Sequence, residues 1–172
     1  MIRLVTLDPI EQETLSKLTR IIFQAYGLGC EYAGDVAVPK EAVKGDSLDA
    51  VELLAKAQGV KSFADDKIVY LTSRPFLPRD LPSGKAPTTG FAQYDGERAV
   101  VTTHGLPGGE DLLKRLAKQV LHDVGHLWEL HHCLDPRCSM YATWAPSFSS
   151  GEPILCTFCR EKSEAKIRLA KT

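Results

Sequence analysis

Two kinds of metal-binding side chain cluster in one short part of this chain. Residues 122–159 contain four of the five histidines and four of the five cysteines in the 172-residue sequence. Imidazole nitrogen and thiolate sulfur are donors that zinc commonly takes in proteins. The clustering therefore predicts metal binding, and the surrounding elements are expected to hold these side chains in place.

The first two histidines lie on a predicted helix over residues 110–128. At about 100° per residue, one face of this helix is apolar, and His122 and His126 fall on the opposite face. The apolar face comprises Leu113, Leu116, Val120, Val124 and Leu127. Side chains four residues apart lie one above the other on a helix, so the two imidazoles can share one tetrahedral ion. Past the helix, the adjacent His131 and His132 both offer a third imidazole.

Three histidine ligands would leave the fourth position of a tetrahedral zinc ion open, and an open position distinguishes a catalytic zinc from a closed structural one. Such an ion makes water more acidic, and a carboxylate beside the first histidine could take the proton. The carboxylate in that place is Asp123. Aspartate is one methylene shorter than glutamate, so its carboxylate stops about 1.5 Å, one C–C bond, short of where a glutamate would reach.

These residues resemble the signature of the archaemetzincins, a metzincin-type zinc motif HExxHxxGxxHC followed by C-x4-C-x-M and a later CxxC. The resemblance is specific over roughly the last third of the chain. It implies that His122, His126 and His132 bind a catalytic zinc ion, with His132 preferred to His131 because it alone has the family spacing. It also implies that Met140 is the Met-turn residue beneath the three histidines and that Tyr141 is a candidate to hydrogen-bond an oxyanion.

Three departures from the family pattern bear on activity and on the local fold. Asp123 stands where the family has its glutamate base, which weakens the expected peptidase activity. Glu129 stands where the family has glycine, so the turn out of the helix must either take a left-handed conformation at some cost or follow another route. The stretch between Met140 and Cys156 is slightly shorter than in the family, which changes a loop length and not the ligands.

The cysteines predict a second metal site of a different kind. Cys133, Cys138, Cys156 and Cys159 form a C-x4-C and C-x2-C set. Four thiolates close a tetrahedron and leave no room for substrate, so this zinc would be structural, giving two zinc ions per chain. The alternative is a pair of disulfide bonds, which requires an oxidising compartment. Cys30 is expected to be an incidental free thiol, and His104 a residue outside the cluster.

The order of predicted elements indicates an α/β fold. Strands are expected over 2–7, 36–38 and 67–72, helices over 10–26 and from Asp46 or Ser47 to Gln58, and an irregular loop over 73–88. Residues 89–94 and 98–103 form a hairpin through Asp95-Gly96, and the tail 161–171 forms a charged helix. The resemblance implies a metzincin-like twisted mixed sheet whose antiparallel edge strand, here 89–94, lies over the zinc helix. The expected single domain, 1–172, divides into 1–130 and a C-terminal part, 131–172, joined by the four-cysteine site.

Composition narrows the class of protein. The hydrophobic share of 44% and charged share of 25% are ordinary for a globular protein, and a net charge of −1 argues against a nucleic-acid-coating protein. Neither a signal peptide nor a membrane span is evident, so a cytoplasmic protein is expected. The resemblance implies a zinc metallopeptidase acting on peptides or proteins. The alternative is a non-hydrolytic zinc protein that binds peptides or partners in the same cleft.

Overall fold

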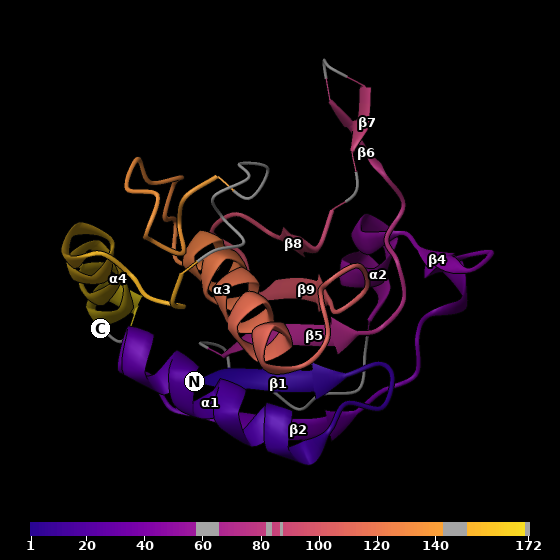
Figure 1. The fold of residues 1–172 in the computed structure, drawn as a ribbon, viewed down its shortest axis with the longest axis horizontal. Helices are drawn as coiled ribbons and strands as arrows, with labels where there is room; N and C mark the ends of the chain where they lie inside the picture. The colour runs from indigo at the N-terminus through magenta and orange to yellow at the C-terminus, as the bar shows by residue number, and fades with distance from the viewer. Residues whose placement is uncertain (58–65, 82–83, 87, 143–150, 171–172) are drawn as a thin grey trace.

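A five-stranded mixed sheet forms the centre of the molecule (Figure 1). The computed structural model describes residues 1–57, 66–81, 84–86, 88–142 and 151–170. The strand order is β2-β1-β5-β9-β8. The parallel strands are β1 (Ile2–Thr6), β2 (Cys30–Asp35), β5 (Lys67–Thr72) and β9 (Arg98–Thr102), and β8 (Gly90–Ala92) runs antiparallel to β9. The expected mixed sheet with one antiparallel edge strand is therefore confirmed.

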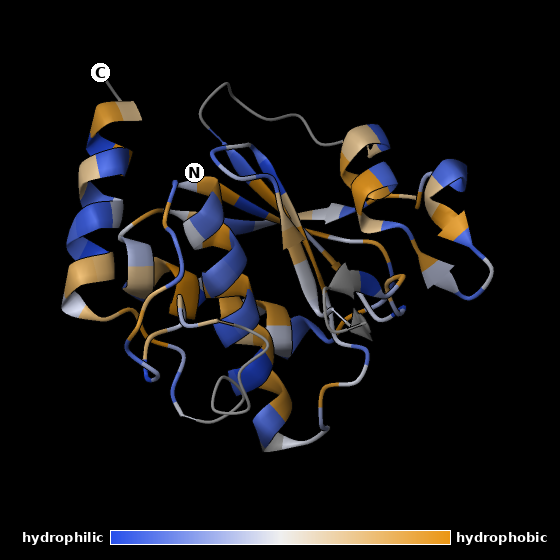
Figure 2. Ribbon diagram, turned by 90° about the horizontal axis from the view of Figure 1, so that it is seen from above, coloured by the Kyte–Doolittle hydropathy of each residue, from blue (hydrophilic) through white to orange (hydrophobic). Residues whose placement is uncertain are grey.

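Helices cover both faces of the sheet. α1 (Gln12–Tyr26) and α3 (Glu110–Leu127) lie side by side on one face, and α2 (Ala50–Lys56) packs on the other (Figure 1). α4 (Thr157–Ala170) packs against the end of α1 and shows hydrophilic bands along its length (Figure 2). The remaining short elements are η1 (Lys40–Ala42), β3 (Val43–Lys44), β4 (Ser47–Leu48), β6 (Arg79–Leu81) and β7 (Gly84–Ala86).

Successive side chains of the central strands point alternately into the two hydrophobic cores on opposite faces of the sheet. In β1, Ile2 and Leu4 point into the core beneath α1 and α3, whereas Val5 points into the core beneath α2. In β5, Val69 and Tyr70 divide between the same two cores. Strands that are buried on both faces are continuous apolar runs, which is why 67–72 could be predicted with its correct bounds.

α3 is buried around most of its circumference, more completely than its amphipathic pattern predicts. Leu116, Val120 and Val124 on the apolar face are fully buried, and His122 and Asp123 on the polar face are only 3% exposed. The polar face is covered by β8 and by the chain that follows the helix, so its side chains line an interior cleft. That environment shifts the pKa of His122, Asp123 and His126.

Two predicted elements differ in the structure. The second strand is Cys30–Asp35 and not 36–38; its alternating burial is that of an edge strand held by main-chain pairing with β1, which leaves little apolar signal. The cap of α2 is Asp49, whose carboxylate accepts hydrogen bonds from the N–H groups of Val51 and Glu52, and not Asp46 or Ser47. The end predicted at Gln58 lies outside the described residues.

The proline-rich segment 73–88 is not wholly irregular, because it contains an antiparallel hairpin. β6 pairs with β7, with Arg79 opposite Ala86, and stands above β8 in Figure 1. Pro75 and Pro78 precede β6 and so do not interrupt its main-chain pairing. The hairpin brings a segment that was predicted to be a loop to the rim of the cleft.

The turn out of α3 is made by a residue in the left-handed region. Glu129 has φ 57°, and its N–H donates to the carbonyl oxygen of His126 while that of Leu130 donates to Gly125. The Glu129 carboxylate forms an ion pair with Lys166 on α4. The chain thus makes the family's sharp turn without the family's glycine.

Within the described residues, no helix combines the length and the apolar character needed to cross a membrane.

The strain at Glu129 can be separated from its ion pair by two substitutions. Glu129→Gly and Glu129→Ala both lose the contact with Lys166, but only alanine keeps a β-carbon at positive φ. We expect Glu129→Gly to be about 1 kcal/mol more stable than Glu129→Ala, measured by urea unfolding at equal metal content. Equal stability of the two variants would show that the turn carries no such strain.

Candidate metal centres

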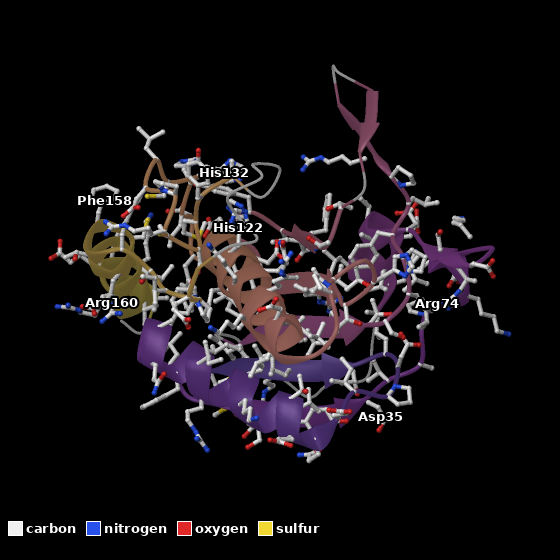
Figure 3. The ribbon with its side chains drawn as sticks, viewed as in Figure 1. Asp35, Arg74, His122, His132, Phe158 and Arg160 are labelled. Carbon is white, nitrogen blue, oxygen red and sulfur yellow. The ribbon has the colours of Figure 1, made fainter. Side chains whose placement is uncertain are left out.

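Three histidines converge at the C-terminal half of α3. Nitrogen atoms of His122, His126 and His132 all lie within 4.8 Å of one another, and the Nε2 atoms of His122 and His126 are 3.0 Å apart. Figure 3 shows His122 and His132 on the same side of the molecule, from α3 and from the segment that follows it. The structure therefore brings together the three residues that the sequence singled out.

The hydrogen bonds of the two helical histidines determine which nitrogen carries the proton. Nδ1 of His122 lies 2.8 Å from the carbonyl oxygen of Ser139, and Nδ1 of His126 lies 2.8 Å from that of Leu130. A carbonyl oxygen only accepts, so each Nδ1 carries the proton and each neutral ring has its lone pair on Nε2. Two lone pairs that face each other at 3.0 Å repel unless a cation lies between them.

The acidity of these rings favours a metal ion over an extra proton. Burial, followed by the charge of His126, lowers the pKa of His122 to about 3. Burial also lowers the pKa of His126 and His132, and the positive charge of Arg79 adds to the effect on His132. Neutral imidazoles are the form that binds metal, so the donor set fits a zinc ion.

His131 faces away from this cluster. Its Nε2 lies 2.9 Å from the hydroxyl of Tyr94, which donates its own proton to the carbonyl oxygen of Glu129, and the two rings stack with centroids 5.1 Å apart. The adjacent side chains of His131 and His132 thus point to different places. The structure therefore brings His132, and not His131, together with His122 and His126.

Met140 packs against the helix that carries the histidines. It is fully buried, and a β-carbon added at Gly125 would lie only 2.2 Å from its sulfur. Gly125 therefore provides the room for a methionine beneath His122 and His126, a function that its position inside a helix does not reveal. Tyr141 lies at the end of the same turn, where its N–H donates to the carbonyl oxygen of Cys138.

A residue that the sequence did not single out, Gln119, holds the carboxylate of Asp123 at the wall of the cleft. Its Oδ2 accepts a hydrogen bond of 2.8 Å from Gln119, whose own Oε1 accepts one from Thr89. A β-carbon at Gly90 on β8 would lie 2.0 Å from Asp123 Oδ2. Only glycine lets the edge strand approach the carboxylate so closely, which gives Gly90 a specific function.

The surroundings of Asp123 raise its pKa to about 7, because burial disfavours the carboxylate more than the hydrogen bond from Gln119 favours it. A general base is most effective when its pKa lies near the working pH. Because Asp123 lies next to His122 and has a raised pKa, it is suited to accept and release a proton near neutral pH.

The cleft that contains these groups has a volume of about 250 Å³. Its lining residues are Arg79, Thr88, Gly90, Phe91, Ala92, Tyr94, Gln119, His122, Asp123, His126 and His132. Its wall is β8, the last strand of the sheet, whose outer edge is available for main-chain pairing within the part of the chain that the structure describes. Arg79, on the β6–β7 hairpin, enters this cleft from a segment in which sequence patterns gave no signal.

A second cluster lies beside the first. The sulfur atoms of Cys133, Cys138, Cys156 and Cys159 lie within 4.8 Å of one another, and all four are free thiols. Those of Cys133 and Cys156 are 3.8 Å apart, which matches the edge of a tetrahedron with zinc–sulfur bonds of about 2.3 Å. The spacing therefore fits four ligands of one ion.

Backbone N–H groups are aimed at these sulfur atoms. Cys138 receives N–H donors from Met140 and Cys156 at 3.4 Å, and Cys133 receives one from Asp135. Burial nevertheless raises the pKa of Cys138 to about 11. Such buried thiols need a cation to become thiolates, because metal coordination removes the thiol proton outright.

The two clusters share one stretch of backbone. Cys138 is followed by Ser139, whose carbonyl oxygen accepts from His122, and by Met140, whose carbonyl oxygen accepts from the N–H of Cys133. Fixing the position of Cys138 therefore also fixes the Ser139 carbonyl oxygen that orients the ring of His122. Cys30 and His104 lie away from both clusters, and burial raises the pKa of the Cys30 thiol to about 12.

Comparisons with known proteins agree with this geometry. The profile described as peptidase family M54 matches residues 35–165. A curated archaemetzincin from Methanopyrus kandleri is 31% identical over 157 residues, covering 80% of this chain and 83% of the relative. A crystal structure of archaemetzincin from the same organism superposes with a TM-score of 0.81 at 22% identity, covering 97% of this chain and 94% of that chain.

A second solved structure shares the fold. Archaemetzincin from Archaeoglobus fulgidus, complexed with malonate, gives a TM-score of 0.75 at 16% identity and covers 94% of this chain and 99% of that one. At these identities the two superpositions establish the fold, and the profile and the curated relative establish the family. With most of its length matched by both, this chain belongs to peptidase family M54 and is a zinc metallopeptidase of the archaemetzincin type.

Proposed function

We propose that this chain hydrolyses peptide bonds at a zinc ion held by His122, His126 and His132, with Asp123 as general base. The observation that supports the ligand set is the pair of Nε2 lone pairs facing each other at 3.0 Å, each fixed by a carbonyl oxygen at the opposite side of its ring. Zinc in such a site polarises a carbonyl group and makes water more acidic.

In this proposal, Asp123 takes the proton of the attacking water and passes it to the leaving amine. Gln119 holds Oδ2 of Asp123, so the other carboxylate oxygen is the one that moves the proton. Because Asp123 lies at the cleft wall, the length of its side chain determines whether the carboxylate can contact the attacking water. An aspartate that is about 1.5 Å shorter than a glutamate is expected to slow this step without preventing zinc binding.

The substrate is proposed to be an extended peptide paired with the outer edge of β8. Main-chain pairing of this kind recognises a peptide without particular side chains. Gly90 allows close approach between this strand and α3, which places the bound main chain beside Asp123 and the histidines.

The four cysteines are proposed to hold a second, structural zinc ion, so that each chain binds two. Its function would be to fix Ser139 and Met140 beneath the histidines. Thiols that must remain free to bind metal require a reducing compartment, which supports the proposed cytoplasmic location.

Metal content distinguishes the ligands from their neighbours. We expect about two zinc ions per wild-type chain and about one in His132→Ala, measured by inductively coupled plasma mass spectrometry after gel filtration, because each site takes one ion. His131→Ala is the matched control and should retain both, since its ring contacts Tyr94. Loss of zinc from His131→Ala with retention in His132→Ala would reverse the assignment.

Substitution of Gly90 tests whether the close approach of β8 positions Asp123. In Gly90→Ala the new β-carbon would displace Asp123 or β8, so kcat/KM for peptide hydrolysis should fall at least about tenfold at unchanged zinc content, in line with loss of a positioned base. Gly108→Ala is the control, because a β-carbon there meets nothing within 4 Å. Full activity of Gly90→Ala would show that this contact does not position the base.

Substitutions that change the length or remove the charge of the Asp123 side chain test its function as general base. Asp123→Ala should lower kcat/KM by about 10²–10³, and Asp123→Glu should raise it above the wild type by restoring reach. Zinc-loaded proteins are compared on a broad peptide library read by mass spectrometry, with zinc content measured in parallel. Equal inertness of all three proteins would contradict the proposed peptidase activity and leave a peptide-binding zinc protein.

A further inference from the structure

Arg79 is a charged residue of the cleft that the proposed reaction does not use. It lies on β6 and lines the cleft that also contains His122, Asp123 and His132. It therefore faces the place where a bound peptide would meet the metal site.

The guanidinium lies over an aromatic ring. Its central carbon is 5.9 Å from the centroid of the Phe91 ring, near the outer limit of about 6 Å for a cation–π contact. Contact with the face of a ring leaves the N–H groups, which lie in the plane of the guanidinium, free to donate. Arg79 is exposed, and among the side chains that the structure describes no acidic group pairs with it.

The charge balance of the cleft favours an anionic group in the substrate. Asp123 is the one acidic residue among the lining residues, and its carboxylate is already engaged with Gln119. The positive charges of the cleft are the guanidinium of Arg79 and, once zinc is bound, the two charges of the ion. A cleft with such a surplus attracts negatively charged ligands.

We propose that Arg79 is a specificity-determining residue that binds a carboxylate of the peptide substrate close to the scissile bond. This inference rests on the proposed function, because it places the peptide along β8. The carboxylate belongs either to an Asp or Glu side chain or to the C-terminus of the peptide, and both offer the planar pair of oxygen atoms that matches the N–H pattern of a guanidinium.

The test uses peptides based on the neutral amide Ala-Phe-Gly-Ala-Leu-Ala, labelled at the N-terminus with an uncharged BODIPY dye. One series carries a single Glu at each position in turn, a second carries Gln at the same positions, and a third peptide is neutral with a free C-terminal carboxylate. Affinity is measured by fluorescence anisotropy on zinc-loaded Asp123→Ala protein at constant salt, and kcat/KM is measured separately on protein with Asp123 intact.

We expect Glu at one position, or the free C-terminus, to bind roughly five- to tenfold more tightly than its neutral counterpart, the range expected for a partly exposed charge pair. Arg79→Gln should abolish that preference, and Arg79→Glu should reverse it in favour of the same peptide carrying Lys. The matched control is Arg74→Gln, which removes a positive charge from the same segment at a site far from His122 and His132 (Figure 3).

The two arms identify the source of the carboxylate, and either one supports the proposal. Equal affinity for charged and neutral peptides, or equal weakening of both by Arg79→Gln, would overturn it, as would a failure of all these peptides to bind. Hydrolysis without any dependence on Arg79 would contradict this inference alone. Binding that depends on Arg79 without hydrolysis by the chain with Asp123 intact would contradict the proposed function alone.

Discussion

The structure of the cleft depends on two imidazole lone pairs that face each other across 3.0 Å. The carbonyl oxygens of Ser139 and Leu130 fix both tautomers, and burial keeps the rings neutral. Neither carbonyl belongs to α3: one follows a cysteine of the second cluster, and the other follows the left-handed turn at Glu129. The orientation of the His122 and His126 rings is therefore fixed by segments outside the helix. A cation between the two Nε2 atoms would bind both lone pairs and remove the repulsion between them.

The same constraint links the four-cysteine cluster to the chemistry. Cys133 directly follows His132, and Cys138 directly precedes Ser139, so each cysteine is joined through the backbone to a part of the histidine site. Met140 then packs into the space that Gly125 leaves open. A metal that closes the cysteine cluster would thus add rigidity where the histidines need it, although it touches none of them.

Sequence patterns predicted well those features that depend on spacing and burial. The helix with His122 and His126, the continuous apolar strand 67–72 and the hairpin at Asp95-Gly96 each have a period or a turn signal of their own. Strand Cys30–Asp35 and the β6–β7 hairpin escaped prediction because main-chain pairing holds them and their side chains carry little pattern. Arg79 escaped because its place in the cleft comes from a contact between segments distant in sequence. Gln119 lies one helical turn before Asp123, and its contact with Thr89 on a distant segment could not be predicted.

X-ray diffraction from zinc-loaded crystals, with anomalous data collected on both sides of the zinc absorption edge, tests the ligand assignment most directly. We predict one anomalous peak at about 2.0–2.1 Å from nitrogen atoms of His122, His126 and His132, with its remaining side toward the cleft. A second peak should lie among the four cysteine sulfurs. Imidazole rings turned away from a common point, or an ion enclosed on every side by protein atoms, would contradict it.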